Sequence, residues 1–285
     1  TNYILSLRYD GTSPSSSRVR VYTEETLSAT GTEASATIGN SNQPLTLGAL
    51  NKDYSSYLGA DYAEVIQYNF AVNTAQRIII NNYLSAQYNI SLSSNDLYIN
   101  DNPSNGNYDY EVAGIGRIDA SNIHSDAQGS SAPRFLNPTD LNDGEFMLWG
   151  HNNATGNEYS DIPAGIEGRM NRVWRISERN TSGSSVDVGT VDLRWDLSKG
   201  TPATAAHLRL LIDTDNDGAF SDETPISGAT SLGGNQFEFS GVSLIRDSLR
   251  FTLASIDTAN TPLPVTWLNF YGEYTGYHNV LKWAT

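Results

Sequence analysis

The feature that most constrains the fold is a series of short segments in which apolar and polar residues alternate. The clearest is residues 191–197, where Val191, Leu193, Trp195 and Leu197 alternate with polar side chains. A period of two places one set of side chains on each face of a strand. Comparable segments lie at residues 110–117, 145–149, 170–178, 208–212, 237–239 and 249–253. Short strands between turns rich in Gly, Asn and Asp predict an all-β fold of antiparallel β-sandwiches.

One segment, residues 73–88, has helical periodicity instead. Its apolar residues, among them Ile79 and Tyr83, recur one turn apart. Asn73 can accept hydrogen bonds from the first free backbone N–H groups, and Gln76 stands three residues later, as a capping box requires. We expect a helix here that connects two β-rich modules.

The N-terminal part is also predicted to be β-structure. Residues 3–9 and 18–22 alternate as strands do, with a Ser-rich turn between them. Residues 24–33 lack apolar periodicity and are predicted to be a loop. Further strands are expected at residues 37–39, 45–50 and 62–68, the last leading into the helix.

The order of these segments resembles the back half of a laminin G-like or concanavalin A-like lectin domain. Such domains often have a strand ending in Asp-Gly, a "vrvY" strand, a short "l.lG" strand and a closing "aEviiYn" strand before a helix. The corresponding residues here are 7–11, 19–22, 45–48 and 63–69. The resemblance implies a partial lectin-like sandwich over residues 1–88, closed by the helix 73–88. Its missing strands would lie upstream, or a partner chain would cover the open sheet edge, or the segment is a smaller, self-contained sheet.

Residues 89–256 resemble an uncharacterised β-module of large surface proteins from gliding bacteria that use type IX secretion. The matching stretches, which begin at residue 83 within the predicted helix, are YLSAQYNISL, VAGIGRID, FMLWGHN, MNRVWRISE, LRLLIDTDNDGAFSD and FTLAS. Residues 257–264 are predicted to be a stiff, Pro-containing linker. Residues 265–285 resemble the opening hairpin of an immunoglobulin-like or fibronectin-like domain, with strands expected at 267–271 and 280–283. The resemblance implies part of a multidomain protein that is secreted or displayed on the cell surface.

Composition excludes several classes of function. Acidic residues number 32 and basic residues 17, giving a formal charge of -15, whereas a nucleic-acid or anionic-membrane surface needs a basic footprint. There is no cysteine, which excludes thiol chemistry and Cys-ligated zinc. No apolar run approaches the length of a membrane span. No recognisable nucleophile, metal-binding histidine or phosphate-binding motif is present, so we predict a non-enzymatic chain with no catalytic residues.

The stretch DTDNDGAFSDE, residues 213–223, predicts a calcium loop. Three carboxylates at alternate positions, followed by glycine, match the first half of an EF-hand-type loop, and Ca²⁺ requires six to eight oxygen ligands. The twelfth position is Thr224 rather than Glu, so the bidentate ligand would come from the tenth or eleventh. The expected ligands are Asp213, Asp215, Asp217, Asp222 and Glu223. A solvated acidic turn is the alternative.

Aromatic residues near polar loops suggest sugar binding, because pyranose rings stack on exposed aromatic faces. The predicted ligand-binding residues are Tyr54, Tyr57, Trp149, Asn152, Asn153 and Tyr159. Packing in the core is the alternative for the aromatic residues. For Trp174 and Trp195, strand alternation favours the core.

These observations leave three hypotheses for function. The first is adhesion or carbohydrate binding, with a glycan or surface polymer as partner. The second is a structural stalk or filament subunit whose open sheet edges are completed by neighbouring domains or chains. The third is an accessory module of a secreted hydrolase.

Overall fold

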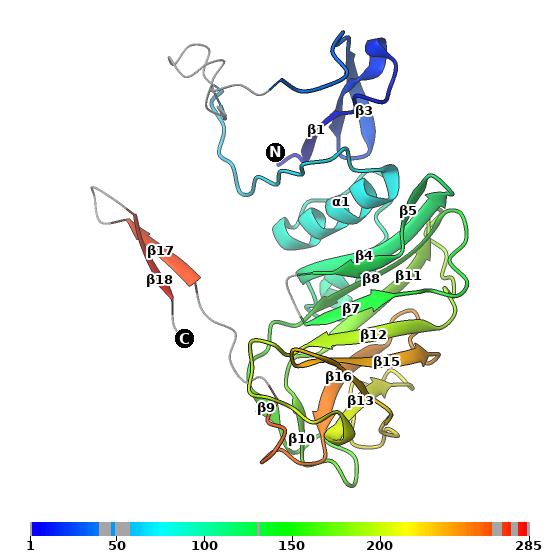
Figure 1. Cartoon of the computed structure of the whole chain (residues 1–285), viewed down its shortest axis with the longest axis vertical. Helices are drawn as coiled ribbons and strands as arrows, with labels where there is room; N and C mark the ends of the chain where they lie inside the picture. The colour runs from blue at the N-terminus through cyan, green and yellow to red at the C-terminus, as the bar shows by residue number, and fades with distance from the viewer. Residues whose placement is uncertain are drawn as a thin grey trace. The chain divides into compact units, whose positions relative to one another are not determined.

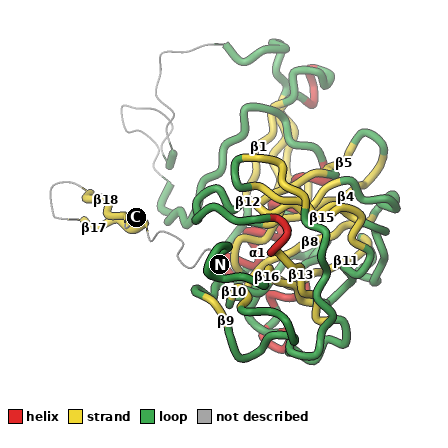
Figure 2. Tube along the Cα trace, turned by 60° about the horizontal axis from the view of Figure 1, so that its bottom comes forward, coloured by secondary structure: helices red, strands yellow, loops and turns green. Residues whose placement is uncertain are grey.

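Antiparallel β-sheets dominate the computed structural model, which describes residues 2–39, 47–48, 58–129, 132–263, 270–274 and 279–283, the last two ranges by backbone only (Figure 1). The mostly-β prediction is confirmed. Two units follow each other along the chain, residues 3–72 and residues 73–285. Short loops make most of the connections between strands (Figure 2).

The second unit is built on two sheets. The larger has eight strands in the order β5-β4-β8-β11-β16-β10-β9, with β13 also paired to β16. Its strands are β4 (Tyr110–Asp119), β5 (Asn122–His124), β8 (Glu145–His151), β9 (Asn157–Glu158), β10 (Gly168–Met170), β11 (Trp174–Asn180), β13 (Leu208–Asp213) and β16 (Arg250–Ser255). The smaller has the order β14-β15-β12-β7-β6. Its strands are β6 (Asp126–Gln128), β7 (Pro133–Leu136), β12 (Val191–Asp196), β14 (Thr230–Gly233) and β15 (Gln236–Val242).

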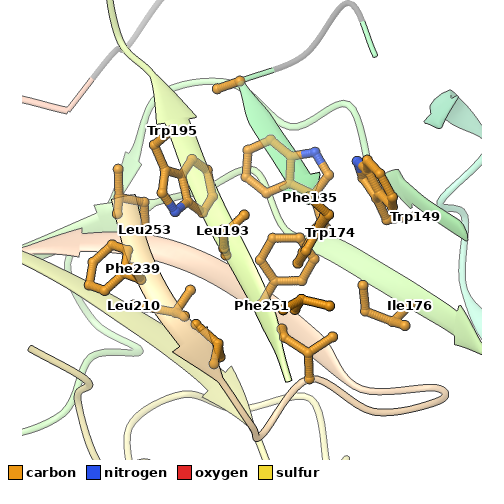
Figure 3. Close-up of a cluster of buried hydrophobic side chains, with 14 of the residues drawn as sticks. Phe135, Trp149, Trp174, Ile176, Leu193, Trp195, Leu210, Phe239, Phe251 and Leu253 are labelled. Carbon is orange, nitrogen blue, oxygen red and sulfur yellow. The ribbon is translucent and has the colours of Figure 1, made fainter. Parts of the chain in front are cut away.

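Aromatic side chains from both sheets form one core between them (Figure 3). Trp174 of the larger sheet meets Trp195 of the smaller sheet edge to face, with ring centroids 5.2 Å apart. Phe251 stacks on Trp174 at 5.8 Å. All three are wholly buried, so the core assignment of Trp174 and Trp195 is confirmed. The alternation of residues 191–197 is confirmed as well, because its apolar set points into this core.

Helix α1 (Thr74–Tyr88) adds a third layer on the other face of the larger sheet. Its predicted capping box is present, since Gln76 N–H donates to Asn73 Oδ1 and Asn73 N–H donates to Gln76 Oε1, both at 2.9 Å. Phe146 and Leu148 of β8 pack with the helix, while their neighbours in β8 point into the sandwich core. The helix therefore belongs to the second unit, and the predicted domain boundary at residue 88 is corrected to residue 72.

The first unit contains one three-stranded sheet, β1 (Leu5–Tyr9), β2 (Val19–Thr23) and β3 (Thr26–Gly31), in sequence order. The prediction of a loop at 24–33 is therefore wrong. Most side chains of β3 are exposed, so no apolar period marks it. Residues 37–39 and 62–68 are not strands in the structure, which corrects two further predictions. Most of residues 45–50 lie outside the described residues.

Two other predictions concern residues after the helix. The single strand expected at 170–178 is two strands, β10 and β11, which both pair with β16. A C-terminal hairpin is present at the level of its backbone: β17 (Phe270–Tyr274), where a strand was expected at 267–271, pairs antiparallel with β18 (Asn279–Trp283). The 3₁₀ turns are Ser15–Ser17, Ile99–Asp101, Pro103–Asn105 and Ala205–His207.

Candidate functional site

The predicted calcium loop begins at the last residue of β13. Asp213 is wholly buried and pairs across the sheet with Arg250 of β16, whose Nη1 lies 2.7 Å from Asp213 Oδ2. The backbone N–H groups of Asp217 and Gly218 also donate to this carboxylate, at 3.1 and 3.0 Å. The first predicted ligand is therefore fixed by the strand and by the loop that follows it.

Three of the predicted ligands come together. Asp213, Asp215 and Asp217 each offer a carboxylate oxygen, and these oxygens lie within 4.8 Å of one another. The backbone turns tightly here, with φ of 61° at Asn216 and 96° at Gly218, a region that glycine and asparagine adopt most readily. The group carries three negative charges and receives one positive charge from Arg250. It could supply part of the oxygen shell that Ca²⁺ needs.

The other two predicted ligands have different positions. Asp222 is exposed and lies outside the cluster. Glu223 is nearly buried, and its oxygens accept the Thr214 N–H at 2.5 Å and the Thr214 hydroxyl at 2.8 Å. Glu223 therefore closes the base of the loop, and its predicted place beside the three aspartates is wrong in this arrangement.

A residue that sequence reasoning missed ties this loop to another one. Asp161 Oδ1 accepts the backbone N–H groups of Phe220 and Ser221 at 2.7 and 2.9 Å, and Asp161 Oδ2 pairs with Arg169 at 2.8 Å. The Arg169 guanidinium in turn lies 4.8 Å from the centre of the buried Phe220 ring. Asp161 is about 60 residues away in sequence, so no local pattern could have indicated this contact.

Two arginine side chains of the larger sheet, Arg250 and Arg175, also support the predicted calcium loop. Arg250 Nε donates to the Tyr108 hydroxyl at 3.0 Å, and Arg250 Nη1 donates to Asn216 Oδ1 at 2.8 Å. Arg175 Nη2 donates to the same Asn216 oxygen at 3.3 Å. Burial, and then the charge of Arg250, lower the pKa of Arg175. Two arginines thus hold the turn and reduce the negative potential around the three aspartates.

The predicted sugar platform is not assembled as expected. Trp149 is wholly buried, and its ring packs edge to face on Phe135 at 4.6 Å, so its assignment to a binding surface is wrong. It lies in a strand with both faces buried, where alternation cannot distinguish core from surface. Asn152 Oδ1 accepts the backbone N–H groups of Ala154 and Val173, both at 3.1 Å, which makes it a loop anchor.

The remaining platform residues differ in exposure and position. Asn153 is exposed, and Tyr159 is 60% exposed, with Asn157 Nδ2 donating to its hydroxyl at 3.3 Å. Tyr54 and Tyr57 lie outside the described residues. Tyr159 is therefore the one predicted aromatic ligand, among those described, that presents its ring to solvent.

A buried histidine, His151, ends strand β8 at the start of the loop that carries Asn152 and Asn153. His151 Nε2 is 2.9 Å from Glu111 Oε2, and His151 Nδ1 accepts the Asn153 N–H at 2.9 Å. The backbone donor fixes the tautomer, so Nε2 carries the proton. Burial lowers the pKa of His151 despite the neighbouring Glu111. Both ring nitrogens are engaged, which makes this histidine an anchor for the loop.

Residues 76–248 match the model of a protein family described as Domain of unknown function (DUF8202). The match covers more than half of the chain, from helix α1 to the loop after β15. No curated protein and no solved structure matches the chain. In the described part of the chain, no helix is long and apolar enough to cross a membrane.

Proposed function

We propose that this chain, which belongs to the DUF8202 family, is a non-catalytic structural part of a multidomain protein that is secreted or displayed on a bacterial cell surface. We further propose that the chain associates with other copies of itself. The hypothesis of a stalk or filament subunit is thereby preferred to that of a lectin. It rests on one observation, the uncovered apolar face of the sheet β1-β2-β3.

The apolar face follows strand period on β1. Tyr3, Leu5 and Leu7 are 63%, 68% and 73% exposed, and their spacing places them on one side of the strand. By register, Leu5 pairs with Thr23 and Leu7 with Val21, so the face continues onto β2. Among the described strands, β1 has a partner on one side only. A strand with a free edge and an apolar face is a template for pairing with another chain.

A second copy is a suitable partner for this strand. If two β1 strands paired antiparallel about Ser6, Leu5 of each copy would lie opposite Leu7 of the other, and Tyr3 opposite Tyr9. The side chains of Tyr3, Leu5, Leu7 and Tyr9 from both copies, eight in all, would then share one face of a continuous six-stranded sheet. Burying a leucine stabilises a complex by roughly 1.5–3 kcal/mol before the cost of association.

Sedimentation velocity over a concentration series tests this proposal. We expect reversible association of the full chain that is lost when Leu5→Lys and Leu7→Lys are combined, because two buried lysines would oppose pairing. Leu244→Lys is the matched control, since Leu244 is 47% exposed in the second unit. A wild-type chain that stays monomeric at every concentration would contradict the proposal.

Carbohydrate binding remains the second candidate, supported by the exposed ring of Tyr159 beside Asn157. A glycan array tests it, with Tyr159→Ala as the variant and Tyr62→Ala as the control, since Tyr62 is an exposed tyrosine in the other unit. Specific binding that is lost in the first variant alone would support this candidate. Binding that is equal in both variants would exclude Tyr159.

We also propose that the three aspartates of the 213–223 loop hold Ca²⁺ in a structural role. Ligand that binds only the folded chain raises its melting temperature, and saturation at 100 times Kd corresponds to roughly 2.7 kcal/mol. Asp215→Asn should abolish the calcium-dependent rise, whereas Asp222→Asn, outside the cluster, should retain it. Equal melting temperatures in calcium and EDTA would contradict this role.

A further inference from the structure

Glu178 is a carboxylic acid inside the sandwich. It lies on β11 two residues beyond Ile176 and four beyond Trp174, both in the core, and strand geometry points it to the same side. Its exposure is 0%. Its partner in β8 is Met147, another core residue. Within the described part of the chain, neither carboxylate oxygen has a hydrogen-bond partner of good geometry.

Two loops close this end of the sandwich, residues 182–188 and residues 243–249, which we call the loop pair. Each inserts a wholly buried apolar residue, Val188 from the first and Ile245 from the second. The loops are joined to each other by an ion pair between Arg246 Nη2 and Asp187 Oδ2 at 3.2 Å. The loop pair therefore lies over the buried Glu178, and this ion pair is one of the contacts that join its two loops.

The second loop is also fastened to β11. Asp247 Oδ1 accepts the Glu178 N–H at 3.0 Å, and Asp247 Oδ2 pairs with Arg179 at 2.7 Å. Ser248 N–H donates to Ile176 O at 2.8 Å. The first loop is held by several backbone bonds: Asn180 N–H donates to Ser184 O at 2.9 Å, Val186 N–H to Glu178 O at 3.2 Å and Asp140 N–H to Val188 O at 2.9 Å. Both loops are thus fastened to the rest of the sandwich by backbone hydrogen bonds.

The charges around Glu178 come from several elements. Asp187 and Asp247 face it from the two loops, together with Arg246. On β8, Glu145 is two residues from Met147, and its Oε2 accepts the Asn142 N–H. On β4, Arg117 pairs with Asp143. Burial above all, and then Asp187, raise the pKa of Glu178 to about 8, while Arg246 and the Val188 N–H lower it slightly. The uncharged acid is the form that fits this site.

We propose that the loop pair is a pH-sensitive lid that closes over uncharged Glu178 and is loosened when Glu178 loses its proton. An ionised Glu178 would be repelled by Asp187 and Asp247 and would require either water or a cation. The cation that acts on Glu178 is Arg246, which is paired with Asp187. If Arg246 turns to Glu178, the ion pair between the loops breaks; if water enters, the loops must part. Both responses open the same end of the core.

The direction of the effect follows from linkage. In the open lid, Glu178 would titrate near its ordinary value of 4.5, and in the closed lid near 8. Closure is therefore strongest below pH 4.5, weakens as pH rises toward 8, and is constant above that. Across this interval the opening equilibrium rises tenfold per pH unit, on the order of a thousandfold in total.

Hydrogen exchange of the full chain, corrected for intrinsic exchange rates, tests the lid. Between pH 5 and pH 8 we expect the opening constant of amides in the loop pair to rise on the order of a thousandfold, with no such change in β8. Glu178→Gln should reduce the rise to less than about threefold, because an amide does not titrate. Glu167→Gln, which alters an exposed glutamate before β10, should leave the rise intact.

A second variant keeps the test decisive if Glu178→Gln does not fold. Asp187→Asn removes a charge that raises the pKa of Glu178, and it releases Arg246. The opening constant of amides in the loop pair should therefore reach its plateau at a lower pH. A pH dependence that is the same in wild type, Glu178→Gln and Asp187→Asn would overturn the proposal. So would a wild-type opening constant that does not change between pH 5 and pH 8.

Discussion

The sandwich of the second unit and the three-stranded sheet of the first unit differ in what covers their apolar side chains. In the sandwich, the larger sheet is covered on one face by the smaller sheet and on the other partly by helix α1. In the first unit, β1 exposes Tyr3, Leu5 and Leu7. Strands of similar length and alternation thus give a closed core in one case and an open face in the other. Alternation determines which side chains share a face, but a second layer is needed to bury them.

The largest expected effect on stability distinguishes the sandwich from the sheet β1-β2-β3. Trp174→Ala should cost about 3–5 kcal/mol in the free energy of unfolding, because Trp174 is wholly buried against Trp195 and Phe251. Leu7→Ala should cost less than about 0.5 kcal/mol in the monomer, since Leu7 is 73% exposed. Urea unfolding followed by circular dichroism measures both, because the first unit contains no tryptophan. Equal losses would mean that the β1 face is covered within one chain.

A smaller effect concerns the polar anchor of the helical layer. Asn82 is wholly buried; its Nδ2 donates to Ile78 O and Asn95 O, and its Oδ1 accepts the N–H groups of Leu97 and Tyr98. Asn82→Ala should cost about 1–3 kcal/mol, because it leaves buried backbone groups without partners. Thermal melting by circular dichroism checks this. A change within error would show that water replaces the lost bonds.

The helix start should have a more modest effect. Asn73→Ala removes the side-chain acceptor of the capping box and should cost about 1 kcal/mol. Asn73→Asp keeps an acceptor and should cost less, so the pair isolates the capping bond from other consequences of the substitution. The same melting experiment ranks the two variants. If Asp proved as costly as Ala, the amide of Asn73, which donates to Ile123 O, would be the more important group.

The smallest effect is a pH dependence in the sandwich. Burial lowers the pKa of His151 below its ordinary 6.5, so the unfolded chain binds the proton more readily. Stability from this residue is therefore fully present above pH 6.5 and decreases as pH falls below it. His151→Gln should flatten that part of the stability profile, measured by urea unfolding at several pH values. A profile that is unchanged by the substitution would assign the acid sensitivity to other groups.

Sequence patterns could predict those parts of the molecule in which one face is buried and the other is not. Residues 191–197 and the capping box at Asn73 are of this kind, and both are found as expected. Strand β3 was missed because its side chains are mostly exposed on both faces. Trp149 was misplaced because FMLW in β8 packs against both the helix and the smaller sheet, so both of its faces are apolar.

The candidate sites were less predictable because their contacts cross the sequence. The three aspartates lie close together because they share one tight loop, which a local motif can indicate. Glu223 and Asp161 serve to shape that loop, and their roles depend on Thr214 and on the backbone of Phe220. Nothing in the sequence indicates that Glu178 is buried, since a charged residue in a strand is ordinarily expected to face solvent.

Hydrogen exchange of β1 at low and high protein concentration tests the central claim most directly. The claim is that the sandwich is complete within one chain, whereas the sheet β1-β2-β3 covers its apolar face by association. The account predicts that amides of β8 and β11 exchange slowly at both concentrations, while those on the free edge of β1 become protected only at the higher one. Protection of that edge that is equally strong at both concentrations would contradict the account.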